Sequence, residues 1–159
     1  MQACTNLRYI DLALCLNLSD SSVTAISTLQ NLLRIGLVRL PNLTDEAVFA
    51  LANRPTLERI HLSYCEDISV AAIAHLLNRV PRITHISLTG VTAFRDDKLG
   101  LQDIRRAPPA DFTEHQRVVF CVFSGQGVQD LRKRLKTLHV SDSVVIDDKP
   151  DAVARPTVA

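Results

Sequence analysis

Two arginines and a histidine recur along this chain at a nearly constant interval. Arg34 and Arg59 are 25 residues apart, and His85 follows after another 26. One interval before Arg34 stands Tyr9. Arginine carries a permanent charge and a planar set of donors, which suits phosphate and carboxylate groups. If the fold brings these positions side by side, they form a row of cations that can bind an anionic ligand.

The interval belongs to a repeated apolar pattern that predicts how these residues are positioned. The pattern Leu-x-x-Ile-x-Leu begins at Leu7, Leu32 and Leu57, and Ile83 opens a fourth copy. Repeats of roughly 20 to 29 residues with this spacing are the leucine-rich signature, in which a short strand opens each unit. We therefore expect an α/β leucine-rich-repeat solenoid, with parallel strands on its concave face and helices on its convex face.

The second half of each unit predicts a helix. Apolar residues recur there at a spacing of i, i+3, which is typical of a helix with one buried side. Ser19, Thr44 and Ser69 precede these segments and are suited to cap their N-termini. Each unit should therefore run from strand through turn to helix.

The exposed positions of the strands give the candidate binding site. Side chains alternate along a strand, so the residues between the buried ones should point to the concave face. Equivalent positions lie side by side, which places Arg34, Arg59 and His85 in one row flanked by Tyr9. The candidate substrate-binding residues are Tyr9, Asp11, Arg34, Arg59, His61, Ser63, His85 and Ser87. The alternative is that these positions are polar for solubility alone.

Overall composition gives little sign of a charged partner. The net charge is +1, so no global field favours nucleic acid or a membrane surface, and we expect neither as a partner. No signal peptide or membrane-spanning run is present, which favours a soluble protein of the cytoplasm, the nucleus or both.

Two of the four cysteines occupy equivalent positions of the repeat. Cys15 and Cys65 should be interior and two units apart. At roughly 5 Å between neighbouring strands they would be about 10 Å apart, beyond the roughly 7 Å limit between Cα atoms for a disulfide. They are interpreted as small buried hydrophobic residues, which points to a reducing compartment.

Three regions follow from these patterns. Residues 1–99 should hold about four repeats, residues 100–138 a helical C-terminal cap, and residues 139–159 a disordered tail rich in short and acidic residues. Residues 3–6 match the end of a repeat, so the chain is expected to begin within an array and to be a fragment of a longer protein. The alternative is that residues 1–6 form a minimal cap.

The predicted cap contains two helical patterns. Thr113 and Gln116 form a capping box, and an apolar helical face should follow it. That face consists of Val118, Val119, Phe120, Val122 and Phe123. A break at residues 124–127 precedes a second amphipathic helix. Its apolar residues are Val128, Leu131, Leu135 and Leu138.

Several residues are of types found in catalytic, metal-binding or phosphate-binding sites, but their spacing does not support these roles. Cys121 and His115 would lie on different faces of one helix, so they are not expected to act as nucleophile and base. His61 and His85 could approach each other, but no further ligand completes a zinc set. The glycines around Gln126 are expected to follow no strand, and they lack a third glycine and a lysine, which indicates a turn. No catalytic residue, metal or cofactor is expected.

A basic run lies in the second predicted helix of the cap. It consists of Arg132, Lys133, Arg134 and Lys136. Such a run could contact nucleic acid, but a solvated helix face is the simpler interpretation.

The chain resembles a known family at two places. The repeats with cysteine at the turn, followed by Asn-Leu-Ser-Asp or Asn-Leu-Thr-Asp, resemble the leucine-rich repeats of F-box substrate receptors. The segment APPADFTEHQRVVFCVFSGQGVQDLRKRL, residues 107–135, is similar to the segment after the repeats in fungal F-box proteins of the glucose-repression-resistance type. Together the resemblance covers about residues 3–138.

The resemblance implies a noncatalytic substrate receptor of an SCF ubiquitin ligase. In that family the repeats hold the protein substrate on a basic concave surface, often through a phosphorylated degron, and partner subunits transfer ubiquitin. The adaptor binds to an F-box, which this sequence lacks, so adaptor binding is assigned to no residue here. The alternative is a noncatalytic leucine-rich-repeat scaffold or inhibitor with no link to ubiquitin.

Overall fold

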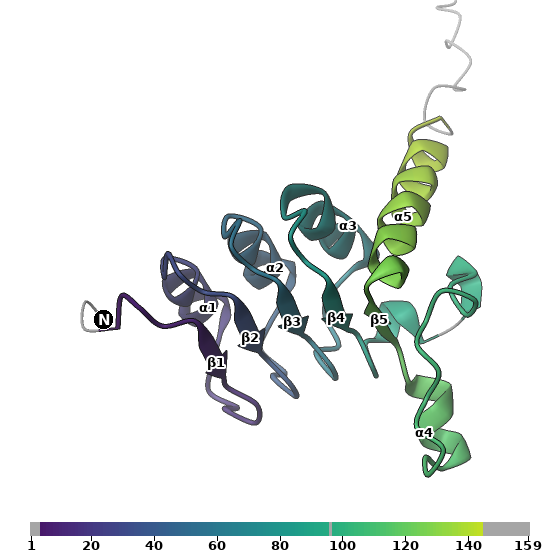
Figure 1. Ribbon diagram of the computed structural model, residues 1–159, viewed down its shortest axis with the longest axis horizontal. Helices are drawn as coiled ribbons and strands as arrows, with labels where there is room; N and C mark the ends of the chain where they lie inside the picture. Colours follow the sequence, from purple (N-terminus) through teal and green to yellow (C-terminus); the bar gives the residue numbers. More distant parts are fainter. Residues whose placement is uncertain (1–3, 96, 145–159) are drawn as a thin grey trace, which may run out of the picture.

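The computed structural model of the chain is an α/β structure built on one five-stranded sheet (Figure 1). It describes residues 4–95 and 97–144. The strands are β1 (Tyr9–Asp11), β2 (Arg34–Gly36), β3 (Arg59–His61), β4 (His85–Ser87) and β5 (Val122–Ser124). The helices are α1 (Asp20–Ile26), α2 (Asp45–Leu51), α3 (Val70–Arg79), α4 (Glu114–Val119) and α5 (Gln126–Val144), with short 3-10 helices at Thr92–Phe94 and Asp97–Leu99.

The first four strands are parallel and follow chain order, and β5 ends the sheet in the antiparallel direction. In Figure 1, α1, α2 and α3 lie along the same side of the sheet. The central residues of β2, β3 and β4, Ile35, Ile60 and Ile86, are buried in the core. The predicted order of strand, turn and helix is confirmed in the units that open at β1, β2 and β3.

The helix N-termini are held by the predicted caps and by a contact between units. Ser19, Thr44 and Ser69 are the N-cap residues of α1, α2 and α3. The carboxylate of Asp45 accepts hydrogen bonds from the N–H and the hydroxyl of Ser69, both at 2.7 Å. Asp20 accepts the equivalent bonds from Thr44 at 2.8 and 2.6 Å. The first residue of one helix therefore fixes the cap of the next.

A residue in the left-handed region follows each parallel strand at the same position of its unit. The φ angles are 63° at Leu14, 57° at Arg39, 60° at Tyr64 and 72° at Gly90. For a residue other than glycine this conformation costs roughly 1 to 2 kcal/mol. At Gly90 a side chain is also excluded sterically, because a Cβ atom would lie 2.4 Å from Cδ1 of Tyr64.

The segment after the repeats differs from the prediction. The capping box at Thr113 is confirmed, but α4 ends at Val119 and has no buried residue. Val118 is exposed, whereas Val122 and Phe123 are buried in β5. The apolar run is therefore not one helical face. Pairing with β4 supplies backbone hydrogen bonds to a short apolar segment that is well suited to a buried strand.

The longest helix, α5, covers the end of the repeat array. Val128, Leu131 and Leu135 are buried in the same core as the repeats, as predicted, and α5 packs against α3. The helix continues to Val144, so the first residues of the predicted disordered tail are helical, and residues 145–159 lie outside the described residues. No helix in the described part is both long and apolar enough to cross a membrane.

The two equivalent cysteines differ in exposure. Cys65 is buried, as predicted, but Cys15 is exposed, which corrects the prediction that it is interior. Cys65 lies in a unit with neighbours on both sides, whereas the unit of β1 and α1 packs against one neighbouring unit within the described residues. All four cysteines of the chain are free thiols.

Candidate functional site

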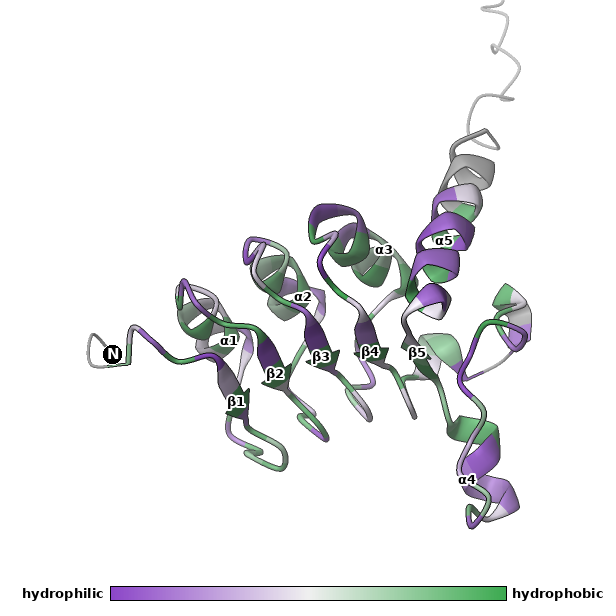
Figure 2. Cartoon of the chain, viewed as in Figure 1, coloured by the Kyte–Doolittle hydropathy of each residue, from purple (hydrophilic) through white to green (hydrophobic). Residues whose placement is uncertain are grey.

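The predicted row lies on the open face of the sheet, the face away from α1, α2 and α3. The strand register aligns Tyr9 with Arg34, Arg34 with Arg59, and Arg59 with His85. Figure 2 shows hydrophilic colour on β2, β3 and β4, the strands that begin with Arg34, Arg59 and His85. We call Tyr9, Arg34, Arg59 and His85 the cationic row. The predicted alignment of these residues is confirmed.

The two arginines of the cationic row are available to a ligand. Both side chains are exposed. The guanidinium carbon of Arg34 lies 5.0 Å from the centroid of the Tyr9 ring, so the ring orients this charge through a cation–π contact. Within the described residues neither guanidinium is assigned a hydrogen bond or an ion pair with another side chain. Both can therefore donate to an anion without breaking an existing bond.

A second row lies beside the first and begins with an acid. The register aligns Asp11, Gly36, His61 and Ser87. The Asp11 carboxylate accepts a hydrogen bond from the N–H of Ala13 at 3.0 Å. It also occupies the space above Gly36, where a Cβ atom would lie 2.7 Å from its Oδ1 atom. The negative charge of this face is thus at β1, and the positive charge of Arg34 and Arg59 is at β2 and β3.

The two histidines of the open face are in contact. Their ring centroids are 5.1 Å apart and the rings are tilted by 37°. The pKa of His85 is lowered to about 4, first by burial and then by the nearby His61 and Arg59. The pKa of His61 is also lowered, by burial and by Arg59, while Asp11 acts in the opposite direction. Both rings are therefore neutral at pH 7, and an anion bound beside them would favour their protonated form.

Arg106 adds a cation to this face that the sequence did not reveal. Its side chain is exposed, and its charge contributes to the low pKa of His85. Its backbone N–H donates to the carbonyl of Val122 in β5 at 2.8 Å, which places Arg106 beside the last strand. Arg106 lies outside the repeated pattern, so no interval could have linked it to the row.

A shallow groove opens over the first strands of this face. Its volume is about 450 Å³. The lining residues are Tyr9, Ile10, Asp11, Arg34, Ile35, Gly36, Val38 and His61. Four of the predicted site residues, Tyr9, Asp11, Arg34 and His61, therefore share one surface that can accommodate an extended chain.

Two of the predicted site residues are not available to a partner. Ser63 and Ser87 are buried, and their hydroxyl oxygens lie 2.7 Å apart in a shared hydrogen bond. Ser87 has β3 on one side and β5 on the other, and a side chain this short does not reach beyond its neighbours. Both serines are therefore removed from the candidate site.

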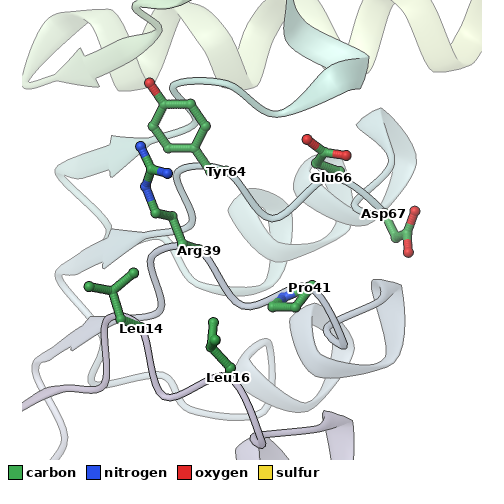
Figure 3. A pocket seen from close by; sticks show the side chains of 7 residues that line it. All are labelled: Leu14, Leu16, Arg39, Pro41, Tyr64, Glu66 and Asp67. Carbon is green, nitrogen blue, oxygen red and sulfur yellow. The ribbon is translucent and has the colours of Figure 1, made fainter.

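A second groove runs along the turns that follow the strands. The sequence did not predict it, because none of the residues that line it is a glycine or asparagine, which usually mark such turns. Its volume is about 490 Å³. Figure 3 shows its lining residues: Leu14, Leu16, Arg39, Pro41, Tyr64, Glu66 and Asp67. The guanidinium of Arg39 stacks on the Tyr64 ring at 4.5 Å from its centroid. The groove combines exposed leucines with charges of both signs, so its lining does not favour one kind of ligand.

The candidate nucleophile is in an unreactive setting. Cys121 follows α4 and is buried, whereas His115 is exposed on that helix. The pKa of the Cys121 thiol is raised to about 11 by burial, with Arg105 acting in the opposite direction. The thiolate is the reactive form of cysteine, so this thiol is a poor nucleophile at pH 7. Within the described residues no group of three histidine, cysteine or acidic side chains could hold a metal ion.

The glycine-containing turn before α5 follows a strand, contrary to the prediction. Gly125 connects β5 to α5 with a φ of 54°. A Cβ atom at Gly127 would lie 2.7 Å from the carbonyl oxygen of Ile104. These glycines therefore allow a left-handed turn and a close backbone approach.

The basic run of α5 is not a uniformly solvated face. Arg132 donates to the carbonyls of four residues within 77–83, at 2.9 to 3.1 Å. Arg134 donates to the Gly100 carbonyl and forms an ion pair with Asp103. Lys133 and Lys136 are exposed, as predicted for a solvated face. The interpretation is thus wrong for the two arginines, which act as bridges to the preceding segments.

A scan of the sequence against models of known protein families found no match.

Proposed function

We propose that this chain is a leucine-rich-repeat solenoid and the substrate-recognition part of an F-box receptor of an SCF ubiquitin ligase. In this proposal the open face binds an acidic, phosphorylated segment of a protein substrate. The observation that carries it is the cationic row, where Arg34 and Arg59 lie exposed on neighbouring strands, and neither has a hydrogen bond or ion pair to another described side chain.

The geometry of the row suits phosphate. Neighbouring strands are roughly 4.8 Å apart, so two guanidinium groups can donate to oxygens of the same phosphate or to adjacent acidic groups. The Tyr9 ring holds Arg34 from one side, and His85 lies on the strand after Arg59. The shallow groove beside Tyr9 offers room for the backbone of an extended ligand.

The link to ubiquitin rests on the resemblance of the repeats and of residues 107–135 to F-box receptors. The parallel strands β1, β2 and β3, each followed by an α-helix on the same side of the sheet, agree with a leucine-rich array. In such a receptor this chain would hold the substrate and partner subunits would transfer ubiquitin. Adaptor binding is assigned to no residue of this chain.

The binding proposal can be tested with a phosphopeptide library. The peptides would have one length, a phosphoserine or phosphothreonine at the centre, and acidic or randomised flanks; a matched set would lack the phosphate. We expect the library to bind with an affinity that falls as salt concentration rises, because exposed charges are screened. Replacing Arg34 and Arg59 by glutamine should weaken binding by about 30-fold or more, or roughly 2 kcal/mol.

The matched control removes two other exposed cations. Lys133 and Lys136 lie on α5, so Lys133→Gln with Lys136→Gln makes the same change in net charge away from the open face. Arg132 and Arg134 are unsuitable, because both have structural bonds. Equal losses in the two double variants would contradict the proposed site. Equal binding of phosphorylated and unphosphorylated peptides would favour a scaffold without phosphate recognition.

A further inference from the structure

An arginine-lined pocket lies at the junction between the repeats and the segment that follows them. Its volume is about 540 Å³. Its charged lining residues are Arg95, Arg105, Arg106, Arg117 and Glu114, and Val118 and Phe120 contribute apolar surface. We call it the C-terminal arginine pocket. With one carboxylate among four guanidinium groups, its lining favours an anion.

The guanidinium groups are held mainly by neutral partners, which position them without cancelling their charge. Arg117 donates to the carbonyls of Phe112 at 3.0 Å and Ala110 at 2.8 Å. Arg105 donates to the carbonyl of Phe94 at 3.3 Å, and its buried Nε atom has no partner among the described residues. The pocket thus has positive charge that is held in place by neutral carbonyl partners.

One side of the pocket has an ion pair that limits its charge. Arg95 donates to the carbonyl of Gly90 at 3.2 Å and contacts Glu66 at 3.4 Å. Both side chains of this pair are substantially exposed, so the pair is weak. An anionic ligand in the pocket would therefore compete with Glu66 for Arg95 at little cost.

Arg106 connects this pocket to the open face of the sheet. It lines the pocket, and its backbone bonds to β5, the strand that follows His85 in the sheet. Its charge is also one of the smaller causes of the lowered pKa of His85, after burial, His61 and Arg59, which agrees with a position near the end of the cationic row. The positive surface therefore continues from Arg34 and Arg59, past His85, to the pocket.

We propose that the C-terminal arginine pocket binds a second acidic or phosphorylated group of the same protein segment that occupies the cationic row. This inference rests on the proposed function, since it assumes that the row binds an acidic chain. It assigns to the segment after the repeats a direct part in binding, in addition to covering the core. The ligand class is an extended peptide with two separated anionic groups.

The sheet geometry sets the separation of the two groups. From β3, which carries Arg59, to β5 is two strand spacings, or roughly 10 Å, and the pocket lies beyond β5. An extended peptide advances roughly 3.3 Å per residue. The second group should therefore be more than about three residues from the first, so a series with separations of roughly one to nine residues covers the distance.

The test uses the full chain and peptides of equal length and composition, with one phosphoserine or two. We expect the second phosphate to tighten binding by about tenfold or more at an intermediate separation, and to have much less effect at the shortest one. Arg95→Gln with Arg106→Gln should abolish this gain, whereas Lys133→Gln with Lys136→Gln should preserve it. The unfolding midpoint of each variant in urea checks that its fold is intact.

The outcomes separate this inference from the proposed function. If singly phosphorylated peptides bind through Arg34 and Arg59 but the second phosphate gives no gain at any separation, the pocket assignment is wrong and the proposed function stands. The same holds if the gain survives the Arg95 and Arg106 substitutions. If replacing Arg34 and Arg59 does not affect the singly phosphorylated peptide, or if neither peptide binds, both proposals are overturned.

Discussion

Between the units of β1, β2 and β3 one contact recurs at equivalent positions, whereas the final segment is joined to the repeats by a contact with no equivalent elsewhere among the described residues. Asp20 holds Thr44, and Asp45 holds Ser69 through the same pair of bonds. By contrast, Arg132 alone bridges α5 to four carbonyls within residues 77–83. The repeats therefore distribute their stability over equivalent contacts, and the final segment concentrates it in a few.

This difference bears on binding as well as on stability. The repeats supply Arg34 and Arg59 at regular positions, and the final segment supplies Arg106 at the end of the same face. The backbone hydrogen bond between Arg106 and Val122 of β5 fixes the position of Arg106. The extent of the positive surface therefore depends on how the final segment packs against the sheet. Four sets of variants test how far the two regions differ.

The largest expected effect comes from the bridge between α5 and α3. Arg132→Met should lower the free energy of unfolding by about 3 kcal/mol, because a charged donor that bonds to four carbonyls, three of them in part-buried contacts, is lost. Urea unfolding measures the loss. Lys133→Gln, at the next and exposed position, should change the free energy by less than about 0.5 kcal/mol. A small decrease in the free energy of unfolding of Arg132→Met would mean that the stability of the final segment does not depend on this one side chain.

The junction between the two regions can be tested at Gly90. Gly90→Ala should cost about 2 to 3 kcal/mol, because alanine disfavours a φ of 72° and its Cβ would contact the Tyr64 ring. Gly100→Ala is the matched control, since Gly100 has a φ of 59° and open space around it, and should cost only about 1 kcal/mol. In a Tyr64→Ala background the two costs should become similar. A persistent difference would exclude the ring as the cause.

The repeated contacts should be equal and independent. Asp20→Ala and Asp45→Ala should each cost about 1 to 1.5 kcal/mol, because each removes two hydrogen bonds to the N-cap residue of the next helix. The double variant should show the sum, since the two sites lie in different units. Thermal or urea unfolding of the three variants measures this. Unequal costs, or a strong coupling between them, would weaken the contrast with the final segment.

The smallest expected effect is a pH dependence at the end of the cationic row. The pKa of His85 is about 4 in the folded protein, below its ordinary value of 6.5, so the unfolded chain takes up a proton first as pH falls. Stability should therefore decrease from about pH 6.5 to pH 4. His85→Asn should reduce this decrease by up to about 1 kcal/mol, a modest amount because the half-buried ring is partly screened by solvent.

Unfolding curves at pH 7 and at pH 4.5 measure that contribution. Three cations and a second histidine face the ring, namely Arg34, Arg59, Arg106 and His61. Arg106→Gln should therefore weaken the pH dependence as well, though less than His85→Asn. If the free energy of unfolding of His85→Asn decreases with pH as much as that of the unchanged protein, His85 does not contribute to the pH dependence.

Periodicity made the strand register predictable but could not locate single long-range contacts. Tyr9, Arg34, Arg59 and His85 align as expected, because a fixed interval in the chain becomes a fixed neighbour in a stacked array. It also suggested that Ser63 and Ser87 are accessible. Both serines are buried. The repeat pattern predicts the direction in which a side chain points, but it does not predict whether larger neighbouring side chains cover it.

The final segment was harder to predict for a physical reason. A short apolar run such as Val122 and Phe123 fits a helix or a strand equally well, and pairing with β4 decides between them. The contacts of Arg132 join residues about fifty positions apart in the chain. The left-handed conformations of Arg39 and Tyr64 were hidden as well, since glycine or asparagine usually marks them.

The antiparallel direction of β5 also affects how the molecule behaves at high concentration. A parallel array that stopped at β4 would present a row of unpaired backbone groups, which is a template for pairing with another chain. Here β5 pairs with β4, and the carbonyl of Val122 on β5 accepts a hydrogen bond from Arg106. The turn of chain that carries the Arg106 charge therefore covers one acceptor of this edge, which leaves fewer free backbone groups for pairing with another chain.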